Sequence, residues 1–207
     1  MSKRLIRIAI LSIPTLIVAA IVAYISLPDR TAGPNAQSQT VASSPEIGGP
    51  FTMVDHTGQE VSSSDMQGEF MLLFFGFTYC PDICPQELST ISRVLDQLGD
   101  DAEDLNALFV SIDPERDTPE AMADFVDLFH PDITGLTGSP EQVEEIASAY
   151  RVFYQRVEND RFEEYTMDHS TFTYLMGPDG ENLGIFPIEL DAETMTASIR
   201  TLMNESL

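Results

Sequence analysis

The chain has 207 residues, of which 34 are acidic and 10 basic, and a formal net charge of −24 at pH 7. All the acidic residues lie after residue 27. This part of the chain contains only seven arginines and no lysine, so its net charge is −27. A surface with this charge excludes nucleic acid and anionic lipid head groups as partners and favours cationic ones. The two cysteines are too few for the usual iron–sulfur clusters, which are held by four cysteines.

Residues 1–27 are predicted to be a short cytoplasmic stub followed by a transmembrane helix. The apolar stretch from Ile8 to Ile25 has 18 residues, and a helix of that length rises roughly 27 Å, close to the thickness of a bilayer core. Three basic residues precede the stretch, and a positive flank stays in the cytoplasm, so the rest of the chain is expected across the membrane. A cleaved signal peptide is the alternative, and it would export the domain as well.

Residues 28–50 are predicted to be a flexible linker, because they are rich in Ala, Ser, Gly, Pro, Gln and Thr and almost devoid of bulky apolar side chains. The folded domain is expected over residues 51–207. Its roughly 155 residues suffice for one domain with a single core, which does not need disulfides for stability. The two cysteines are therefore free to serve a function.

The first half of the domain is expected to contain strands connected by helices. The run from Phe70 to Phe75 lacks polar alternation, which is typical of a central strand buried on both faces. Further strands are predicted at residues 51–54, 59–61, 105–112 and 133–136. Helices are predicted from Pro85 to a stop at Gly99, from Pro119 behind a Thr118 cap, and from Ser139 to about Tyr150 with a capping box closed by Gln142.

The second half is expected to add further strands and a last helix. Residues 151–157 and 162–166 are predicted to be strands joined by a turn at Asn159 and Asp160. A hairpin turn at residues 177–180 separates strands predicted at 171–176 and 183–186, and a helix is predicted from Asp191 to Met203. This order of elements predicts an α/β domain in which a mixed sheet has helices on both faces.

Cys80 and Cys84 lie between the predicted central strand and the helix that follows it. In βαβ units, sites collect in the loop at the carboxyl end of a strand. The positive end of the helix dipole lowers the pKa of a nearby thiol, so at least one of the two is expected to be more acidic than a free cysteine. Two such thiols can form a disulfide, bind a soft metal ion, or do both.

Two thiolates form an incomplete site for most metals, so a third ligand is expected from elsewhere. His56 and His130 are interpreted as solvated or capping residues, in a surface turn and at a helix end. His169 precedes the strand predicted at 171–176, a boundary where its ring can face the cysteine loop. Two thiolates and one imidazole suit copper, as Cu(I) or Cu(II), whereas structural zinc usually has four protein ligands.

Four motifs in one order closely resemble the Sco (SenC) family: Phe77 to Pro85, Ser111 to Pro119, Asp168-His169-Ser170, and Gly177 to Gly180. The resemblance runs from about residue 45 to the end and implies a thioredoxin-like fold. It also implies one copper ion per chain, with its ligands at Cys80, Cys84 and His169. The implied role is in assembling the copper A centre of cytochrome c oxidase, either as a copper metallochaperone or by reducing the cysteines of the oxidase.

This resemblance sets the expected location and partners. With the predicted anchor, the chain would be a single-pass protein of a bacterial inner membrane with its domain in the periplasm. The expected partners are the copper A subunit of the oxidase and another copper chaperone. A thiol reductase is a further expected partner, because paired thiols outside the cytoplasm oxidise by default and a disulfide cannot offer thiolates to copper.

Three alternatives stay open at this stage. A thiol-disulfide oxidoreductase without a metal would use the same fold, although such enzymes usually have two residues between their cysteines and this chain has three. A peroxiredoxin-type peroxidase would usually place a threonine three residues before its cysteine, whereas Thr78 stands two before Cys80. The third alternative is a structural disulfide. Asp82 and the segment Asp113 to Pro119 are interpreted as capping or turn residues and are left out of the ligand set.

Overall fold

The computed structural model describes residues 47–158 and 165–206. The predicted anchor and most of the predicted linker lie outside these ranges. Within them, the helices are all too short or too polar to cross a bilayer. The strands are β1 (Thr52–Asp55), β2 (Glu60–Ser62), β3 (Phe70–Gly76), β4 (Leu105–Ser111), β5 (Ile133–Thr137), β6 (Tyr154–Val157), β7 (Thr166–His169), β8 (Phe172–Met176) and β9 (Asn182–Pro187). The α-helices are α2 (Ile83–Leu98), α3 (Pro119–Val126), α4 (Pro140–Ala149) and α5 (Ala192–Glu205).

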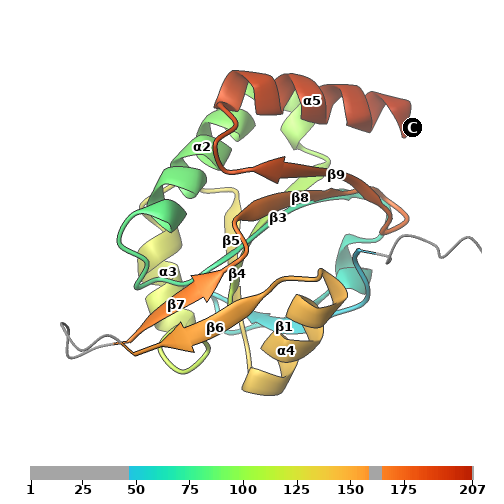
Figure 1. Ribbon diagram of the computed structural model, residues 1–207. Coiled ribbons are helices and arrows are strands. Elements are labelled where there is room, and N and C mark those ends of the chain that lie inside the picture. Colours follow the sequence, from blue (N-terminus) through green and yellow to red (C-terminus); the bar gives the residue numbers. More distant parts are fainter. Residues whose placement is uncertain (1–46, 159–164, 207) are drawn as a thin grey trace, which may run out of the picture. The chain divides into compact units, whose positions relative to one another are not determined.

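Seven strands form one mixed sheet in the order β2-β1-β5-β4-β3-β8-β9 (Figure 1). β3 pairs in parallel with β4 and antiparallel with β8, and all seven of its residues are buried. Burial on both faces explains why its sequence is an unbroken apolar run. The predicted central strand is therefore confirmed, with Gly76 as its last residue.

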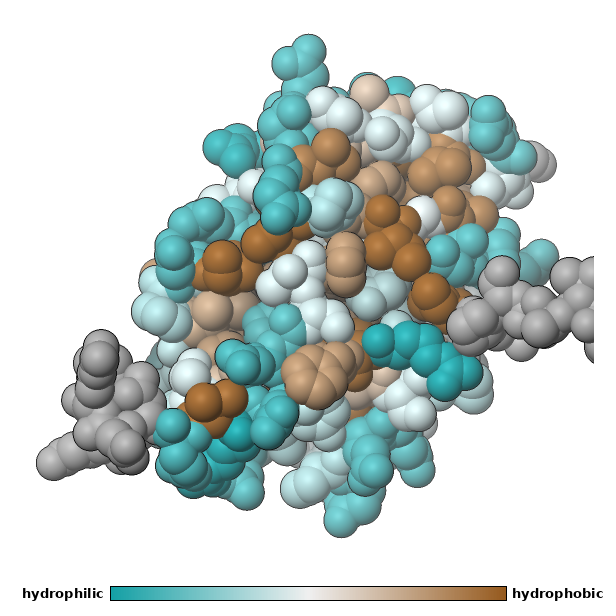
Figure 2. Space-filling view, viewed as in Figure 1, coloured by the Kyte–Doolittle hydropathy of each residue, from teal (hydrophilic) through white to brown (hydrophobic). Residues whose placement is uncertain are grey.

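Helices cover both faces of this sheet, as predicted. Phe74 stacks on Phe109, with ring centroids 6.2 Å apart, on the face that α2 covers. The next residue, Phe75, points to the opposite face because side chains alternate along a strand. There its ring lies 5.5 Å from that of Tyr150, which follows α4. On the surface drawn in Figure 2, hydrophobic residues are interspersed with hydrophilic ones.

The predicted helix starts are largely confirmed. Thr118 Oγ1 accepts a hydrogen bond from Ala121 N, and Ser139 and Gln142 form the reciprocal capping box. The exception is α2, which begins at Ile83, two residues earlier than predicted. Asp82 stands at its N-cap position, but its carboxylate accepts from the Gln86 side chain and not from the helix backbone.

The hairpin of β6 and β7 differs from the prediction. β7 begins at Thr166, where the predicted strand was to end, and Tyr154 pairs with His169. The strand predicted from residue 151 also starts late, because Arg151 adopts a left-handed conformation (φ 57°) while the chain closes α4. The predicted turn at Asn159 and Asp160 lies outside the described residues. β6 and β7 form a two-stranded sheet of their own.

The first described residues lie beside the turn between β8 and β9. Gly48 N donates to Ala149 O at 3.0 Å. Gly48 has a positive φ of 105°, and a Cβ there would lie 2.4 Å from Cε of Met176 and 3.3 Å from the carbonyl oxygen of Gly180. Only glycine fits this approach without strain. Gly49 lines a cavity together with Met71, which lies near the start of β3.

Candidate metal centre

The two thiols are held by the end of β3 and the first turn of α2. Cys84 is fully buried and Cys80 keeps 9% of its surface exposed. Gly76 makes room for the inner thiol, because a Cβ at this position would lie 2.6 Å from Cys84 Sγ and 2.7 Å from Phe109 Cε2. Cys84 N donates to Cys80 Sγ at 3.4 Å, and both thiols are free.

The thiols differ in acidity. A hydrogen bond from the Cys84 side chain lowers the pKa of Cys80 to about 4, with support from His169 and from the backbone of Cys84 and Asp82, against the opposing effect of burial. The same hydrogen bond and its own burial raise the pKa of Cys84. Cys80 is therefore a thiolate at neutral pH and Cys84 a thiol. One thiol is thus the more acidic, as expected, but the largest cause is the partner thiol and not the helix dipole.

His169 is the last residue of β7, and its ring is fixed on three sides. Nδ1 lies 2.8 Å from the carbonyl oxygen of Ser170, and because a carbonyl only accepts, Nδ1 donates. The ring packs edge-on against Phe77 and Phe74, with centroids 6.0 and 6.4 Å away. This arrangement leaves Nε2 as the nitrogen available to a sulfur or a metal ion.

Cys80 and His169 line one cavity of about 270 Å³. Its other lining residues are Phe77, Pro81, Asp82, Ile83, Thr166, Met167, Asp168 and Thr171. Cys84 lies behind Cys80 and is linked to it by the hydrogen bond. No three His, Cys, Asp or Glu side chains in residues 47–158 and 165–206 are already arranged to hold a metal ion. The structure thus brings Cys80 and His169 to the same cavity, whereas Cys84 does not line the cavity and contacts Cys80 from behind.

The other two histidines have structural contacts. His56 Nδ1 accepts a hydrogen bond from Gly135 N at 3.1 Å, which ties the turn after β1 to β5. His130 Nδ1 accepts from Asp132 N and the imidazole lies within 3.7 Å of Asp96. Neither lines the cavity of Cys80, as expected from the sequence.

The segment from Ser111 to Pro119 does more than the predicted turn. Its cap at Thr118 is confirmed, but Asp117 is fully buried and accepts hydrogen bonds from Thr78 Oγ1 and Ser111 Oγ, both at 2.6 Å. Asp113 accepts from Arg116 Nε at 2.6 Å and from Tyr165 Oη at 2.7 Å. The order of the strands could have predicted that these residues meet. β3 and β4 are parallel, so the segments that follow them lie at the same edge of the sheet.

The chain matches the family model SCO1/SenC over residues 39–204. It is 45% identical over 161 residues to the mitochondrial SCO1 homolog of Homo sapiens, covering 77% of this chain and 54% of the relative. The chain spans between half and three fifths of the length of the human, mouse and bovine mitochondrial relatives that it matches.

Solved structures support the same grouping. Arabidopsis thaliana ScoI with copper bound superposes with a TM-score of 0.72 at 36% identity, covering 77% of this chain and 99% of that one. BsSco, a member of the Sco family of cytochrome c oxidase assembly proteins with a disulfide switch, gives a TM-score of 0.60 at 25% identity, covering 76% and 94%. These matches confirm the predicted thioredoxin-like α/β fold with its mixed sheet.

Proposed function

This chain belongs to the SCO1/SenC family, and on that premise we propose that it binds one copper ion through Cys80, Cys84 and His169. The observation that carries the proposal is the cavity shared by Cys80 and His169, with Cys84 hydrogen-bonded to Cys80 behind it. The copper-bound ScoI relative supports it.

The donor set fits copper in both oxidation states. Thiolate sulfur favours Cu(I) and imidazole nitrogen accommodates Cu(II). Cys80 is already ionised, whereas Cys84 must release its proton before its sulfur can act as a ligand, so uptake of copper releases a proton. The bond from Nδ1 to Ser170 fixes the tautomer of His169 that offers Nε2.

We further propose that the copper is cargo for the copper A centre of cytochrome c oxidase. The family assignment of BsSco as an oxidase assembly protein supports this. In this proposal residues 1–27 anchor the chain in a bacterial inner membrane, residues 28–50 link the anchor to the domain, and the domain faces the periplasm. A thiol reductase keeps Cys80 and Cys84 reduced for loading.

Copper titration of the reduced full chain without oxygen tests the copper site. We expect one copper per chain and, for Cu(II), a sulfur-to-copper charge-transfer band. Cys80→Ser and Cys84→Ser should each abolish stable binding, because one thiolate and one imidazole remain. His169→Ala should weaken Cu(II) binding and leave the dithiol able to oxidise. Unchanged Cu(II) affinity in that variant would remove His169 from the ligand set.

The different acidities of the thiols favour thiol exchange as a second function. The Cys80 thiolate would attack a disulfide of the partner and form a mixed disulfide with one partner sulfur, while the other sulfur leaves and takes up a proton from water. Cys84 would then lose its proton and attack Cys80 Sγ, which breaks the mixed disulfide and releases the second partner sulfur to take up that proton. The partner gains two electrons and two protons, and Cys80 and Cys84 become a disulfide. Fast reduction of an oxidase-derived disulfide peptide by copper-free protein, retained in His169→Ala, would favour this function.

A further inference from the structure

The ligands of the proposed site come from two separate parts of the fold. Cys80 and Cys84 belong to the junction of β3 and α2, whereas His169 belongs to the β6–β7 hairpin, which forms its own sheet. From His169 the chain runs on into β8, which pairs with β3. Beyond that link, the distance between Cys80 and His169 depends on side-chain contacts that join the hairpin to the cysteine loop.

Besides the packing of His169 against Phe77 and Phe74, one arginine makes several of those contacts. Arg116 Nε donates to Asp113 at 2.6 Å and Nη1 donates to the carbonyl oxygen of Tyr165 at 2.9 Å. Its guanidinium carbon lies 3.7 Å from the ring centroid of Tyr165 and 4.6 Å from that of Tyr79. Tyr79 directly precedes Cys80, and Tyr165 directly precedes β7. Arg116 thus contacts both halves of the site.

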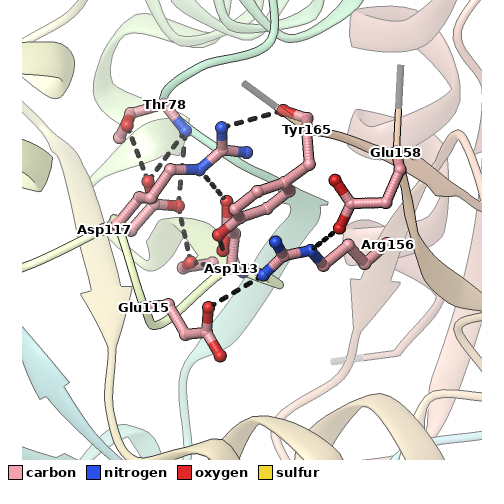
Figure 3. Close-up of polar contacts among 9 residues, drawn as sticks. Thr78, Asp113, Glu115, Asp117, Arg156, Glu158 and Tyr165 are labelled. Atoms are coloured by element: carbon pink, nitrogen blue, oxygen red, sulfur yellow. Dashed lines mark hydrogen bonds and ion pairs between the residues drawn. The ribbon is translucent and has the colours of Figure 1, made fainter. Parts of the chain in front are cut away.

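Tyr165 is held on several sides (Figure 3). Its hydroxyl donates to Asp113 at 2.7 Å, and the guanidinium of Arg156 also lies over its ring at 3.7 Å. From Tyr165 the chain continues into β7, which is paired along its length with β6 and ends at His169. A displacement of Tyr165 would therefore move the imidazole.

The turn from Asp113 to Asp117, which holds Tyr165, also holds the cysteine loop. Asp117 N donates to Asp113 O at 3.0 Å, so the two buried acids are parts of one turn. Asp117 accepts from both N and Oγ1 of Thr78, two residues before Cys80. Asp113 holds Tyr165 on the other side. This turn is the common support of the two halves.

We propose that Arg116 is a positioning residue that sets the separation of Cys80 and His169 and thereby makes the site competent for Cu(II). The inference rests on the proposed copper site. Loss of the Arg116 contacts displaces the imidazole but leaves the thiols in place, because Cys84 belongs to α2 and the loop of Cys80 keeps the bonds from Thr78 to Asp117. Two thiolates satisfy Cu(I), whereas Cu(II) depends on the imidazole. The effect should therefore be selective for the oxidation state.

Arg116→Lys in the full chain is the central test. Lysine keeps a charge for Asp113 but has no second nitrogen to reach the Tyr165 carbonyl at the same time and no planar group to stack. We expect Cu(II) affinity to fall about tenfold, the usual size of such an indirect effect, with a shifted charge-transfer band and unchanged Cu(I) affinity. In the copper-free protein, the ring nitrogen resonances of His169 should shift.

Arg200 offers a matched control. Its Nε donates to Asp101 at 2.8 Å and its Nη2 to the carbonyl of Gln97 at 2.9 Å, the same pattern of contacts on α5. Arg200→Lys should leave both copper affinities and the His169 resonances unchanged. Tyr165→Leu removes the ring that Arg116 holds and should repeat the selective loss; it decides the question if Arg116→Lys fails to fold.

Equal losses of Cu(I) and Cu(II) affinity, or no loss of either, would overturn the positioning role. If the unsubstituted chain binds no copper, the proposed function fails. The His169 resonances of the copper-free variants still decide whether Arg116 positions the ring, and unshifted resonances in both variants would reject that.

Discussion

The strand β3 with α2, and the hairpin of β6 and β7, hold the two halves of the site by different means. β3 is buried along its whole length between strands on both sides, and Cys84 is fully enclosed. The hairpin has two short strands, with exposed residues at Gln155 and Arg156. It is tied to the rest of the domain through the ion pair of Arg156 with Glu115 and through the hydrogen bond and stacking of Arg116 on Tyr165. Burial thus fixes the thiols, whereas the imidazole depends on the rings of Phe74 and Phe77 together with the polar contacts of an exposed hairpin.

Phe74→Ala against Phe153→Ala is the strongest test of this contrast. Phe74 is fully buried in β3, and its truncation should cost about 3–5 kcal/mol of unfolding free energy. Phe153 adjoins the hairpin and is 59% exposed, so its truncation should cost less than about 0.5 kcal/mol. Urea unfolding of both variants measures this. Similar costs would show that the hairpin depends on apolar burial as β3 does.

Gly76→Ala tests how tightly β3 confines the inner thiol. The added methyl would meet Cys84 Sγ and the Phe109 ring at less than 3 Å, so one of them must move, at a cost of about 1–3 kcal/mol. Because Cys84 hydrogen-bonds to Cys80, the rate at which Cys80 reacts with a thiol reagent should also change. An unchanged rate with unchanged stability would mean that Cys84 has free space around it.

Glu87, a buried residue of α2, should make the stability of the fold depend on pH. Its carboxyl group is buried and accepts from Thr173 Oγ1 at 2.6 Å, and burial raises its pKa from 4.5 to about 7. Between these values the folded chain holds a proton that the unfolded chain has lost, so stability should fall as the pH rises through this window. Glu87→Gln keeps an acceptor and should gain about 1–3 kcal/mol at pH 8 but nothing near pH 4. Urea unfolding at the two pH values measures this, and a gain at both would refute the titration.

Arg156→Ala should have the smallest effect. The side chain is 48% exposed and pairs with Glu115 and Glu158, both more exposed still. Exposed pairs of this kind contribute little to stability, and salt screens them. Thermal unfolding in low and high salt should show a small loss that salt removes. A large, salt-independent loss would indicate that stacking on Tyr165 supports the hairpin.

Local patterns predicted most of the fold. The apolar run of β3, the cap at Thr118 and the capping box at Ser139 are short-range signals, and each produced the expected element. The register of β6 and β7 was missed because a two-stranded ribbon at the surface lacks a buried face to fix its pairing.

The candidate site was predictable only in part. The spacing of Cys80 and Cys84 marked the loop, but spacing alone left His169 a weak candidate, and family resemblance supplied it. The hydrogen bonds that support the cysteine loop and the hairpin could not be predicted from the sequence, because they join residues far apart in it. Thr78 and Asp117 are 39 positions apart, and Asp113 and Tyr165 are 52 apart. Side-chain partners at such distances depend on how the strands are ordered in the sheet.

The first described residues lie beside Gly180, at the end of the sheet opposite the thiols. Gly49 shares a cavity with Met71 near the start of β3, whereas Cys80 follows the end of that strand. The seven residues of β3 span roughly 20 Å. Gly49 and Cys80 therefore lie near opposite ends of β3. A fluorescent label attached at Gly49 would therefore leave the cavity of Cys80 and His169 unobstructed.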